Sequence, residues 1–209
     1  MIHDKAEKAK IGIFGGSFDP VHLGHINLAI DARKAARLDR VLFIPARLQP
    51  FKLDKKMTSG EDRLNMIKEA VEGIEGLEAS SYELDTEGIS YTYLTIRAMR
   101  KIYGGDAEIF FIMGTDTFLK LETWKNAQEL LRSCSYLIGS RPGYKQEELR
   151  LCIEKIKREY GTRVINIENR QYDVSSTEIR ERIQKNMPCT DLIHEKTERY
   201  IRQNGLYKE

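Results

Sequence analysis

The chain has 209 residues, 41% of them apolar, which fits a single domain with its own hydrophobic core. Its 34 basic and 32 acidic residues nearly cancel to a net charge of +2, and this balance argues against a nucleic-acid or membrane-surface partner. The three cysteines are odd in number and widely spaced. This pattern argues against a disulfide framework or a structural zinc site and favours the reducing cytoplasm.

The first nine residues are mostly polar and carry no apolar signal segment, so we expect a polar N-terminal extension over residues 1–9. No apolar run in the sequence approaches the roughly 18 residues needed to span a bilayer. We therefore expect neither export nor a membrane segment.

Short apolar runs alternate with longer amphipathic ones up to Asp173. The almost continuously apolar runs, typical of strands buried on both faces, are residues 10–16, 40–46, 108–114 and 135–140. Weaker strand patterns cover 77–84 and 163–168. Helical periodicity lies between these runs, over residues 25–38, 61–74, 91–103, 124–134 and 147–160. This alternation predicts an α/β fold with a doubly wound parallel sheet and helices on both faces.

After Asp173 the strand pattern stops, and helical periodicity covers residues 176–186 and 191–205. Gly205 suits the left-handed conformation that ends many helices. We therefore expect a main α/β domain over residues 10–173 and a small helical C-terminal subdomain over residues 174–209. The two are expected to pack together as one structural unit.

The segment GGSFDPVHLGH follows the first expected strand. Gly15 and Gly16 allow a tight turn and a close approach of the backbone to a ligand. Asp19 is expected to cap the next helix, with Pro20 at a first helical position. Ligands of open parallel sheets bind at the carboxyl ends of the strands, where a helix start offers N–H groups and positive charge to an anion.

Two of the four histidines, His22 and His25, lie in this segment. They are three residues apart, so on a helix they would share one face. The glycine spacing does not fit the dinucleotide-binding fingerprint, and no lysine completes a Walker P-loop. Taken alone, the histidines fit a phosphate site and a polar strand-to-helix connection equally well.

A second helix start lies in the segment VSSTEIRERI, residues 174–183. Ser175 and Glu178 fit a capping box, which is the ordinary start of an amphipathic helix. Capping does not explain Arg180 in the second turn, and its guanidinium is a fork of donors suited to phosphate oxygens. Two helix starts that both suit anions favour a phosphate ligand.

These two segments resemble the signature motifs of the H-x-G-H nucleotidyltransferase superfamily. Four more segments narrow the resemblance to bacterial nicotinate mononucleotide adenylyltransferases: EGISYT (87–92), FIMGTDTFLKLETW (111–124), SRPGY (140–144) and YIRQNGLY (200–207). The resemblance covers essentially the whole chain after residue 9 and implies a Rossmann-like fold. It implies transfer of the adenylyl group of ATP, with Mg²⁺, to nicotinate mononucleotide, which forms deamido-NAD and pyrophosphate. It implies no nucleic-acid or membrane partner.

The resemblance also implies roles for particular residues. Those expected to act on the transferring and leaving phosphates are His22, His25, Arg180 and Lys52. Those also expected around ATP are Gly15, Gly16, Ser17, Phe18, Gly114, Asp116, Ser175, Ser176 and Thr177. Those expected around the mononucleotide are Ser90, Tyr91, Thr92 and Trp124. No protein ligand to a metal is assigned.

Some of these residues also have a purely structural explanation. Asp116 follows a strand, where a carboxylate suits Mg²⁺ or a ribose hydroxyl, but it equally suits a helix N-cap. Trp124 offers a stacking face to an aromatic ring, but it equally suits a partly buried anchor for the next helix. Residues 90–92 open a helix and so suit its cap.

The chain departs from the family pattern at three positions, of which one, His194 in place of a common proline, is expected to matter little. The other two concern the site. Phe51 stands where a histidine is expected, in the loop QPFK of residues 49–52, and Leu94 stands where the family commonly has Asp. Three alternatives therefore stay open: a pantetheine-phosphate adenylyltransferase, a preference for nicotinamide mononucleotide, and a non-catalytic nucleotide-binding homologue. The sequence leaves the oligomeric state undecided, so a homo-oligomer stays open as well.

Overall fold

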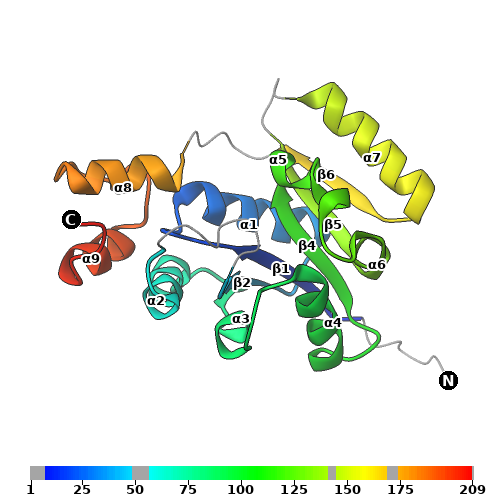
Figure 1. Ribbon diagram of the computed structural model, residues 1–209, viewed down its shortest axis with the longest axis horizontal. Coiled ribbons are helices and arrows are strands. Elements are labelled where there is room, and N and C mark those ends of the chain that lie inside the picture. Colours follow the sequence, from blue (N-terminus) through cyan, green and yellow to red (C-terminus); the bar gives the residue numbers. More distant parts are fainter. Residues whose placement is uncertain (1–7, 49–56, 141–144, 169–173, 209) are drawn as a thin grey trace.

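The structure is a computed structural model that describes residues 8–48, 57–140, 145–168 and 174–208. Within these ranges the chain forms a 6-stranded sheet in the order β3-β2-β1-β4-β5-β6, and every neighbouring pair is parallel (Figure 1). The strands are β1 (Lys10–Gly16), β2 (Arg40–Pro45), β3 (Leu77–Ala79), β4 (Glu108–Gly114), β5 (Ser135–Ser140) and β6 (Val164–Glu168). The order reverses direction between β1 and β4, so the predicted doubly wound α/β fold is confirmed.

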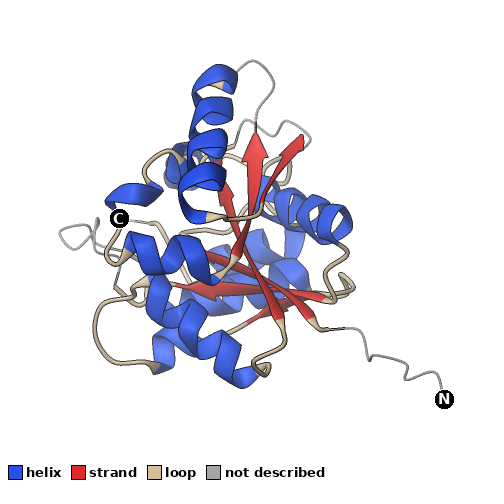
Figure 2. Ribbon diagram, turned by 90° about the vertical axis from the view of Figure 1, so that its right-hand side faces the viewer, coloured by secondary structure: helices blue, strands red, loops and turns tan. Residues whose placement is uncertain are grey.

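Helices cover both faces of the sheet (Figure 2). The helices on one face are α1 (Leu23–Ala36), α2 (Gly60–Val71), α8 (Ser176–Gln184) and α9 (Glu195–Gln203). Those on the other are α4 (Thr92–Ile102), α5 (Thr115–Phe118), α6 (Ala127–Ser133) and α7 (Gln146–Tyr160). The short α3 (Tyr82–Asp85) and the 3₁₀ turn η1 (Leu121–Thr123) lie in the connections. In the described part of the chain, no helix has the length and apolar character needed to cross a membrane.

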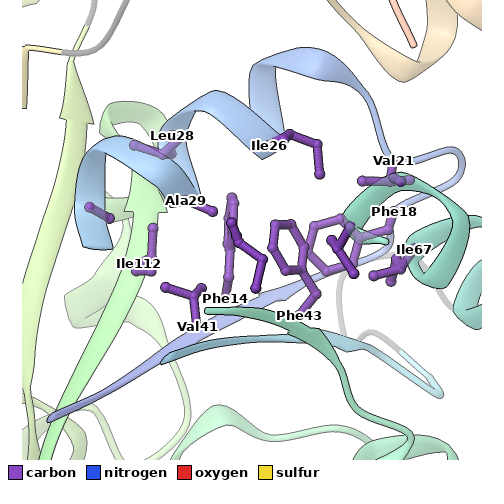
Figure 3. Close-up of a cluster of buried hydrophobic side chains, with 14 of the residues drawn as sticks. Phe14, Phe18, Val21, Ile26, Leu28, Ala29, Val41, Phe43, Ile67 and Ile112 are labelled. Carbon is purple, nitrogen blue, oxygen red and sulfur yellow. The ribbon is translucent and has the colours of Figure 1, made fainter. Parts of the chain in front are cut away.

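The core has two halves because side chains alternate between the faces of each strand. Phe14 and Phe43 point to the half that contains α1 and α2, whereas Ile13 and Ile44 point to the half beneath α4. Figure 3 shows the first half, where the rings of Phe14, Phe18 and Phe43 pack against one another. Their centroids lie 5.3 to 5.5 Å apart. This aromatic cluster supports the turn that follows β1.

Two element predictions are wrong in part. The expected strand over 77–84 ends at Ala79, because Ser80 Oγ accepts from Tyr82 N (3.3 Å) and starts a turn into α3. The helix expected over 191–205 is confined to α9, with His194 as its N-cap. Gly205 adopts the expected left-handed conformation, with φ of 62°.

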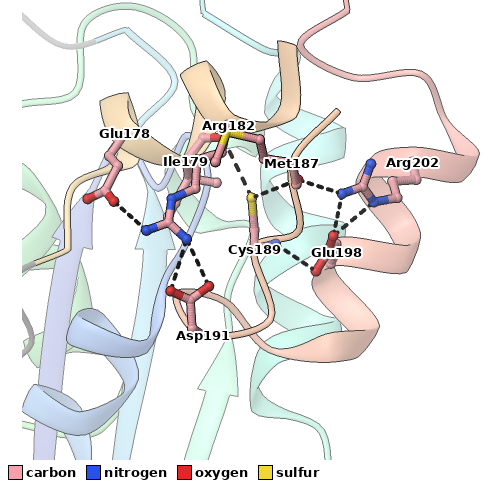
Figure 4. Close-up of polar contacts among 8 residues, drawn as sticks. All are labelled: Glu178, Ile179, Arg182, Met187, Cys189, Asp191, Glu198 and Arg202. Atoms are coloured by element: carbon pink, nitrogen blue, oxygen red, sulfur yellow. Dashed lines mark hydrogen bonds and ion pairs between the residues drawn. The ribbon is translucent and has the colours of Figure 1, made fainter. Parts of the chain in front are cut away.

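The C-terminal helices share the core with the sheet. Ile179, Ile183 and Ile201 are fully buried in the same cluster as Phe14, and α9 lies beside α2 (Figure 1). Figure 4 shows the polar contacts that join α8 to α9 through the connecting segment. The division between domain and subdomain falls within residues 169–173, outside the described ranges, and stays a prediction, as does the extension over residues 1–9.

Candidate active site

A cavity of about 830 Å³ opens at the carboxyl end of the sheet, where the strand order reverses between β1 and β4. It is lined by most of the site residues predicted from the sequence. These are Gly15, Gly16, Ser17, Phe18, His22, His25, Ser90, Tyr91, Thr92, Gly114, Asp116, Trp124 and Ser176. Ser175, Thr177 and Arg180 lie near it, at the start of α8, but are not among its lining residues. Lys52 and Phe51 lie outside the described residues.

The two histidines form the start of α1. His22 is the N-cap: its Nδ1 accepts from His25 N (3.3 Å), and His25 Nδ1 accepts from His22 N (3.3 Å). The rings are stacked, with centroids 3.6 Å apart. Because each Nδ1 is an acceptor, a neutral ring carries its proton on Nε2. Each histidine therefore presents a hydrogen-bond donor, as a phosphate ligand requires.

The prediction that Asp19 caps α1 and that Pro20 opens it is wrong. The helix begins at Leu23, and the side chain that accepts from its free N–H groups is the imidazole of His22. The Asp19 carboxylate is 8% exposed and bonds elsewhere. A backbone turn over residues 17–20, followed by Val21, separates β1 from this cap.

Aromatic contacts fix the orientation of His25. Its ring packs edge-to-face on Phe18 and Phe14, with centroids 5.1 and 5.8 Å away. Phe18 is 2% exposed and has φ of 49°, a left-handed conformation that is rare for a bulky residue. A Cβ on Gly16 would lie 3.1 Å from the Phe18 ring, so this close approach favours glycine. Gly16 thus leaves room for the Phe18 ring, which packs against His25.

The start of α8 is bonded to this turn, so the two predicted anion-binding helix starts come together. Ser176 Oγ donates to Pro20 O (2.9 Å), and Arg180 Nη1 donates to Asp19 O (2.7 Å). Ser175 caps α8 as expected, because its Oγ accepts from Glu178 N (3.1 Å). Arg180 therefore contacts the turn that precedes the two histidines, through the main-chain carbonyl of Asp19.

The opposite end of the cavity is aromatic. The start of α4 lies here, with Tyr91 as an N-cap that makes no side-chain cap bond. Trp124 is half-buried and packs edge-to-face on Phe111, with centroids 6.3 Å apart. Trp124 lines the cavity as well, so its position is compatible with both the structural explanation and the ligand-binding one. Lys125 Nζ lies 4.5 Å from the centre of the Tyr91 ring.

Asp116 does not cap a helix, because Gly114 is the N-cap of α5. Its carboxylate lines the cavity and forms an ion pair with Lys145 (3.1 Å). Leu94, the departure from the family pattern, is 43% exposed and is not among the lining residues. Within the described ranges, no three His, Cys, Asp or Glu side chains group as metal ligands.

Two charged residues that line the cavity were missed by sequence analysis. Glu83 is buried, and its Oε1 accepts from Thr95 Oγ1 (2.6 Å). Lys125 is the only lysine or arginine among the described lining residues. Neither belongs to a motif: Glu83 falls in a segment expected to be a strand, and Lys125 in one expected to be a helix. An acidic residue in an otherwise half-apolar run was the only signal for Glu83.

Burial raises the pKa of the Glu83 carboxyl, although hydrogen bonds from Thr95 and Ser90 lower it. A carboxyl with a raised pKa in the folded state stabilises the fold below its unfolded pKa, and this contribution is lost as pH rises through the folded pKa. We therefore expect the increase in Tm from wild type to Glu83→Gln to be larger at about pH 8 than at about pH 4. These two pH values lie on either side of the usual pKa of a glutamate side chain.

Thermal unfolding of both proteins at the two pH values checks this expectation. Glu87→Gln is the control, since Glu87 is exposed in the same segment. A Tm difference between Glu83→Gln and wild type that is the same at both pH values would contradict the burial argument.

The fold and the cavity define a nucleotide-binding α/β protein of the cytidylyltransferase-like class, and the family model of that description matches residues 13–182. A probable nicotinate-nucleotide adenylyltransferase of Thermoanaerobacter sp. (strain X514) is 38% identical over 96% of this chain and 95% of its own length. One from Clostridium novyi (strain NT) is 37% identical over 95% and 99%. The chain belongs to the nicotinate-nucleotide adenylyltransferase family, which confirms the resemblance seen in its motifs.

Solved structures share the fold. The Plasmodium falciparum nicotinic acid mononucleotide adenylyltransferase complexed with NaAD superposes with a TM-score of 0.75 at 22% identity. The match covers 95% of this chain and 97% of that one. At this identity the likeness supports the Rossmann-like architecture alone.

Proposed function

We propose that the chain transfers the adenylyl group of ATP to nicotinate mononucleotide, forming deamido-NAD and pyrophosphate in NAD biosynthesis. One observation carries the proposal: a single cavity joins a pair of stacked histidine donors to an aromatic end that contains Tyr91 and Trp124. The first suits phosphates and the second a pyridine ring. Relatives that match over nearly their whole length carry the name of this activity.

The chemistry requires little from the protein beyond position and charge. A phosphate monoester has a second pKa of about 6, so the mononucleotide phosphate is already a nucleophile at neutral pH. Its oxygen forms a bond to the α-phosphorus of ATP, and the bond from that phosphorus to the bridging oxygen of pyrophosphate breaks. No general base is needed. The site must align two polyanions and stabilise the charge on the phosphates.

We assign His22 and His25 as Nε2 donors to the phosphate oxygens, with His25 the closer to the transferring group. Arg180 and Lys52 are assigned to the β- and γ-phosphates. Ser175, Ser176 and Thr177 add donors at the start of α8. The contacts of α8 with residues 19 and 20 support this assignment, because they bring Arg180 to the turn that precedes His22 and His25.

Mg²⁺ enters the proposal as a companion of ATP. Mg²⁺ in such sites is usually held by one or two carboxylates, several waters and the substrate phosphates. Asp116 and Glu83 are the carboxylates among the described lining residues, and Asp116 is the more exposed of the two. When bound, the ion neutralises phosphate charge. The three free thiols, Cys134, Cys152 and Cys189, fit the cytoplasmic location we propose.

We expect kcat/KM for nicotinate mononucleotide to exceed that for nicotinamide mononucleotide by at least about tenfold. The start of α4 offers N–H donors, and Lys125 adds a positive charge beside Tyr91, so a carboxylate is favoured over a neutral amide. Loss of one charge-assisted hydrogen bond costs about 1.5–3 kcal/mol. Steady-state pyrophosphate release with each mononucleotide, and with phosphopantetheine as a third acceptor, measures the preference.

Two variants identify which residue distinguishes the carboxylate of nicotinate from the amide of nicotinamide. Trp124→Ala should weaken both mononucleotides and leave their ratio nearly unchanged, because stacking does not distinguish acid from amide. Thr92→Val, which removes a hydroxyl at the start of α4, should bring the kcat/KM values for the two mononucleotides closer together. Equal kcat/KM values on the wild-type enzyme would overturn the nicotinate assignment, and no turnover with any acceptor would favour the non-catalytic homologue.

A further inference from the structure

The turn of residues 17–20 is bonded to three segments that lie far away in the sequence. We propose that Arg63 and Tyr207 are positioning residues that act through this turn to hold His22 and His25 in place for adenylyl transfer. The proposal rests on the proposed function. It adds two residues that are not among the cavity's lining residues: Arg63, which lies in no motif, and Tyr207, which ends the segment YIRQNGLY and had no role assigned to it.

Asp19 is the centre of the arrangement. Its side chain is buried, and its Oδ1 accepts from Tyr207 Oη (2.7 Å) while Oδ2 accepts from Thr58 N (3.4 Å). A buried carboxylate is costly unless its oxygens are paired. Tyr207 lies 188 residues away in the sequence, so this bond ties the C-terminal segment to the turn.

Arg63 lies on α2 beneath the same turn and is 2% exposed. Its Nη1 donates to Ser17 O (2.9 Å), and its Nε donates to Thr58 O (3.0 Å). Burial lowers the pKa of the guanidinium, while the negative charge of Asp19 acts in the opposite direction. A buried cation of this kind requires both an opposite charge and directed acceptors, and the turn supplies them.

Tyr207 is neutral and therefore a donor at physiological pH, because burial and the neighbouring Asp19 raise the pKa of its phenol. Its hydroxyl also lies 3.8 Å from Met66 Sδ, one turn of α2 beyond Arg63. The two residues thus meet the turn from the same side, one bonded to the Ser17 carbonyl and the other to the Asp19 carboxylate.

The turn needs this support because of its conformation. Phe18, between the two bonded residues, has a left-handed backbone, which persists only where the surroundings hold it. Phe18 also makes the edge-to-face contact with the His25 ring, and the turn continues through Val21 into the cap at His22. Donors aimed at a transition state must be fixed closely in space, so a looser turn lowers kcat before it unfolds the protein.

The test compares two tyrosines of the C-terminal segment. Tyr207→Phe removes the bond to Asp19, whereas Tyr200→Phe removes the bonds of its hydroxyl to Asp62 (2.9 Å) and Asn65 (3.2 Å), neither of which belongs to the turn. We expect Tyr207→Phe to lower kcat about tenfold, the rate equivalent of one lost hydrogen bond to a charged group. KM for nicotinate mononucleotide should change little. Tyr200→Phe should leave kcat within about twofold of wild type at a comparable change in Tm.

Amide hydrogen exchange gives a readout that does not depend on turnover, and it separates this proposal from the proposed function. Exchange in the peptide of residues 15–25 should rise in Tyr207→Phe and stay at the wild-type level in Tyr200→Phe. Arg63→Lys, which keeps the charge but loses the fork, should lower kcat as well. Equal effects of the two tyrosine variants, or faster exchange with unchanged kcat, would overturn the positioning role.

Discussion

Replacing His25 with alanine should lower kcat by at least about 100-fold, while Kd for ATP changes far less. The reason is that a donor aimed at charge on the transferring phosphate acts mainly in the transition state, and loss of one such donor costs about 2.7–4 kcal/mol. Steady-state kinetics with ATP and nicotinate mononucleotide, together with ATP binding by calorimetry, measure both quantities.

The capping role of His25 requires a second variant. His25→Asn keeps an acceptor near the position of Nδ1, which bonds to His22 N, but removes the Nε2 donor. It should lose as much activity as His25→Ala with a smaller loss of Tm. His194→Ala is the control, because His194 Nδ1 also accepts from a backbone N–H at a helix start, that of α9, and His194 does not line the cavity. Near-normal turnover of His25→Asn would contradict the catalytic assignment.

Arg180→Ala should raise KM for ATP by about 10- to 100-fold, the effect of losing charge-assisted hydrogen bonds worth roughly 1.5–3 kcal/mol. The guanidinium has five donors, so bonds to Asp19 O and Thr177 Oγ1 leave others for phosphate oxygens. KM for nicotinate mononucleotide should change less. Initial rates at varied concentrations of each substrate measure this difference.

Arg182 provides the matched control on the same helix. It pairs with Glu178 (2.8 Å) on the same helix and with Asp191 (2.9 Å), and the second pair links α8 to the segment before α9 (Figure 4). Arg182→Ala should lower Tm and leave KM for ATP near the wild-type value. If Arg180→Ala instead lowers Tm steeply with unchanged KM, Arg180 is a structural residue that only braces the turn.

The sheet was predictable because strands buried on both faces leave a plain signal, continuous apolar runs separated by helical periods. The edge strand β3 was overextended, since serine side chains that bond to the backbone end a strand without changing its apolar pattern. Local signals therefore located the sheet, and its weakest strand was the least predictable.

The site was predictable only where one motif held its residues together. The cap of α1 was assigned to Asp19 because aspartate is a common N-cap, yet the partner of that carboxylate lies 188 residues away. Nothing local distinguishes a capping aspartate from one that accepts a hydrogen bond from a distant tyrosine. Glu83 and Lys125 enter the cavity through the packing of α3 and η1, which the sequence patterns did not resolve.

The most direct test of adenylyl transfer follows the α- and γ-phosphates of ATP into the products. The protein is incubated with Mg²⁺, nicotinate mononucleotide and ATP that carries radioactive phosphorus at either the α- or the γ-position, and the products are separated by chromatography. Bond cleavage between the α- and β-phosphates predicts that α-label appears in deamido-NAD and γ-label in pyrophosphate, in equal amounts. Transfer of γ-label to the mononucleotide would contradict the account. So would the absence of any label transfer that requires the mononucleotide.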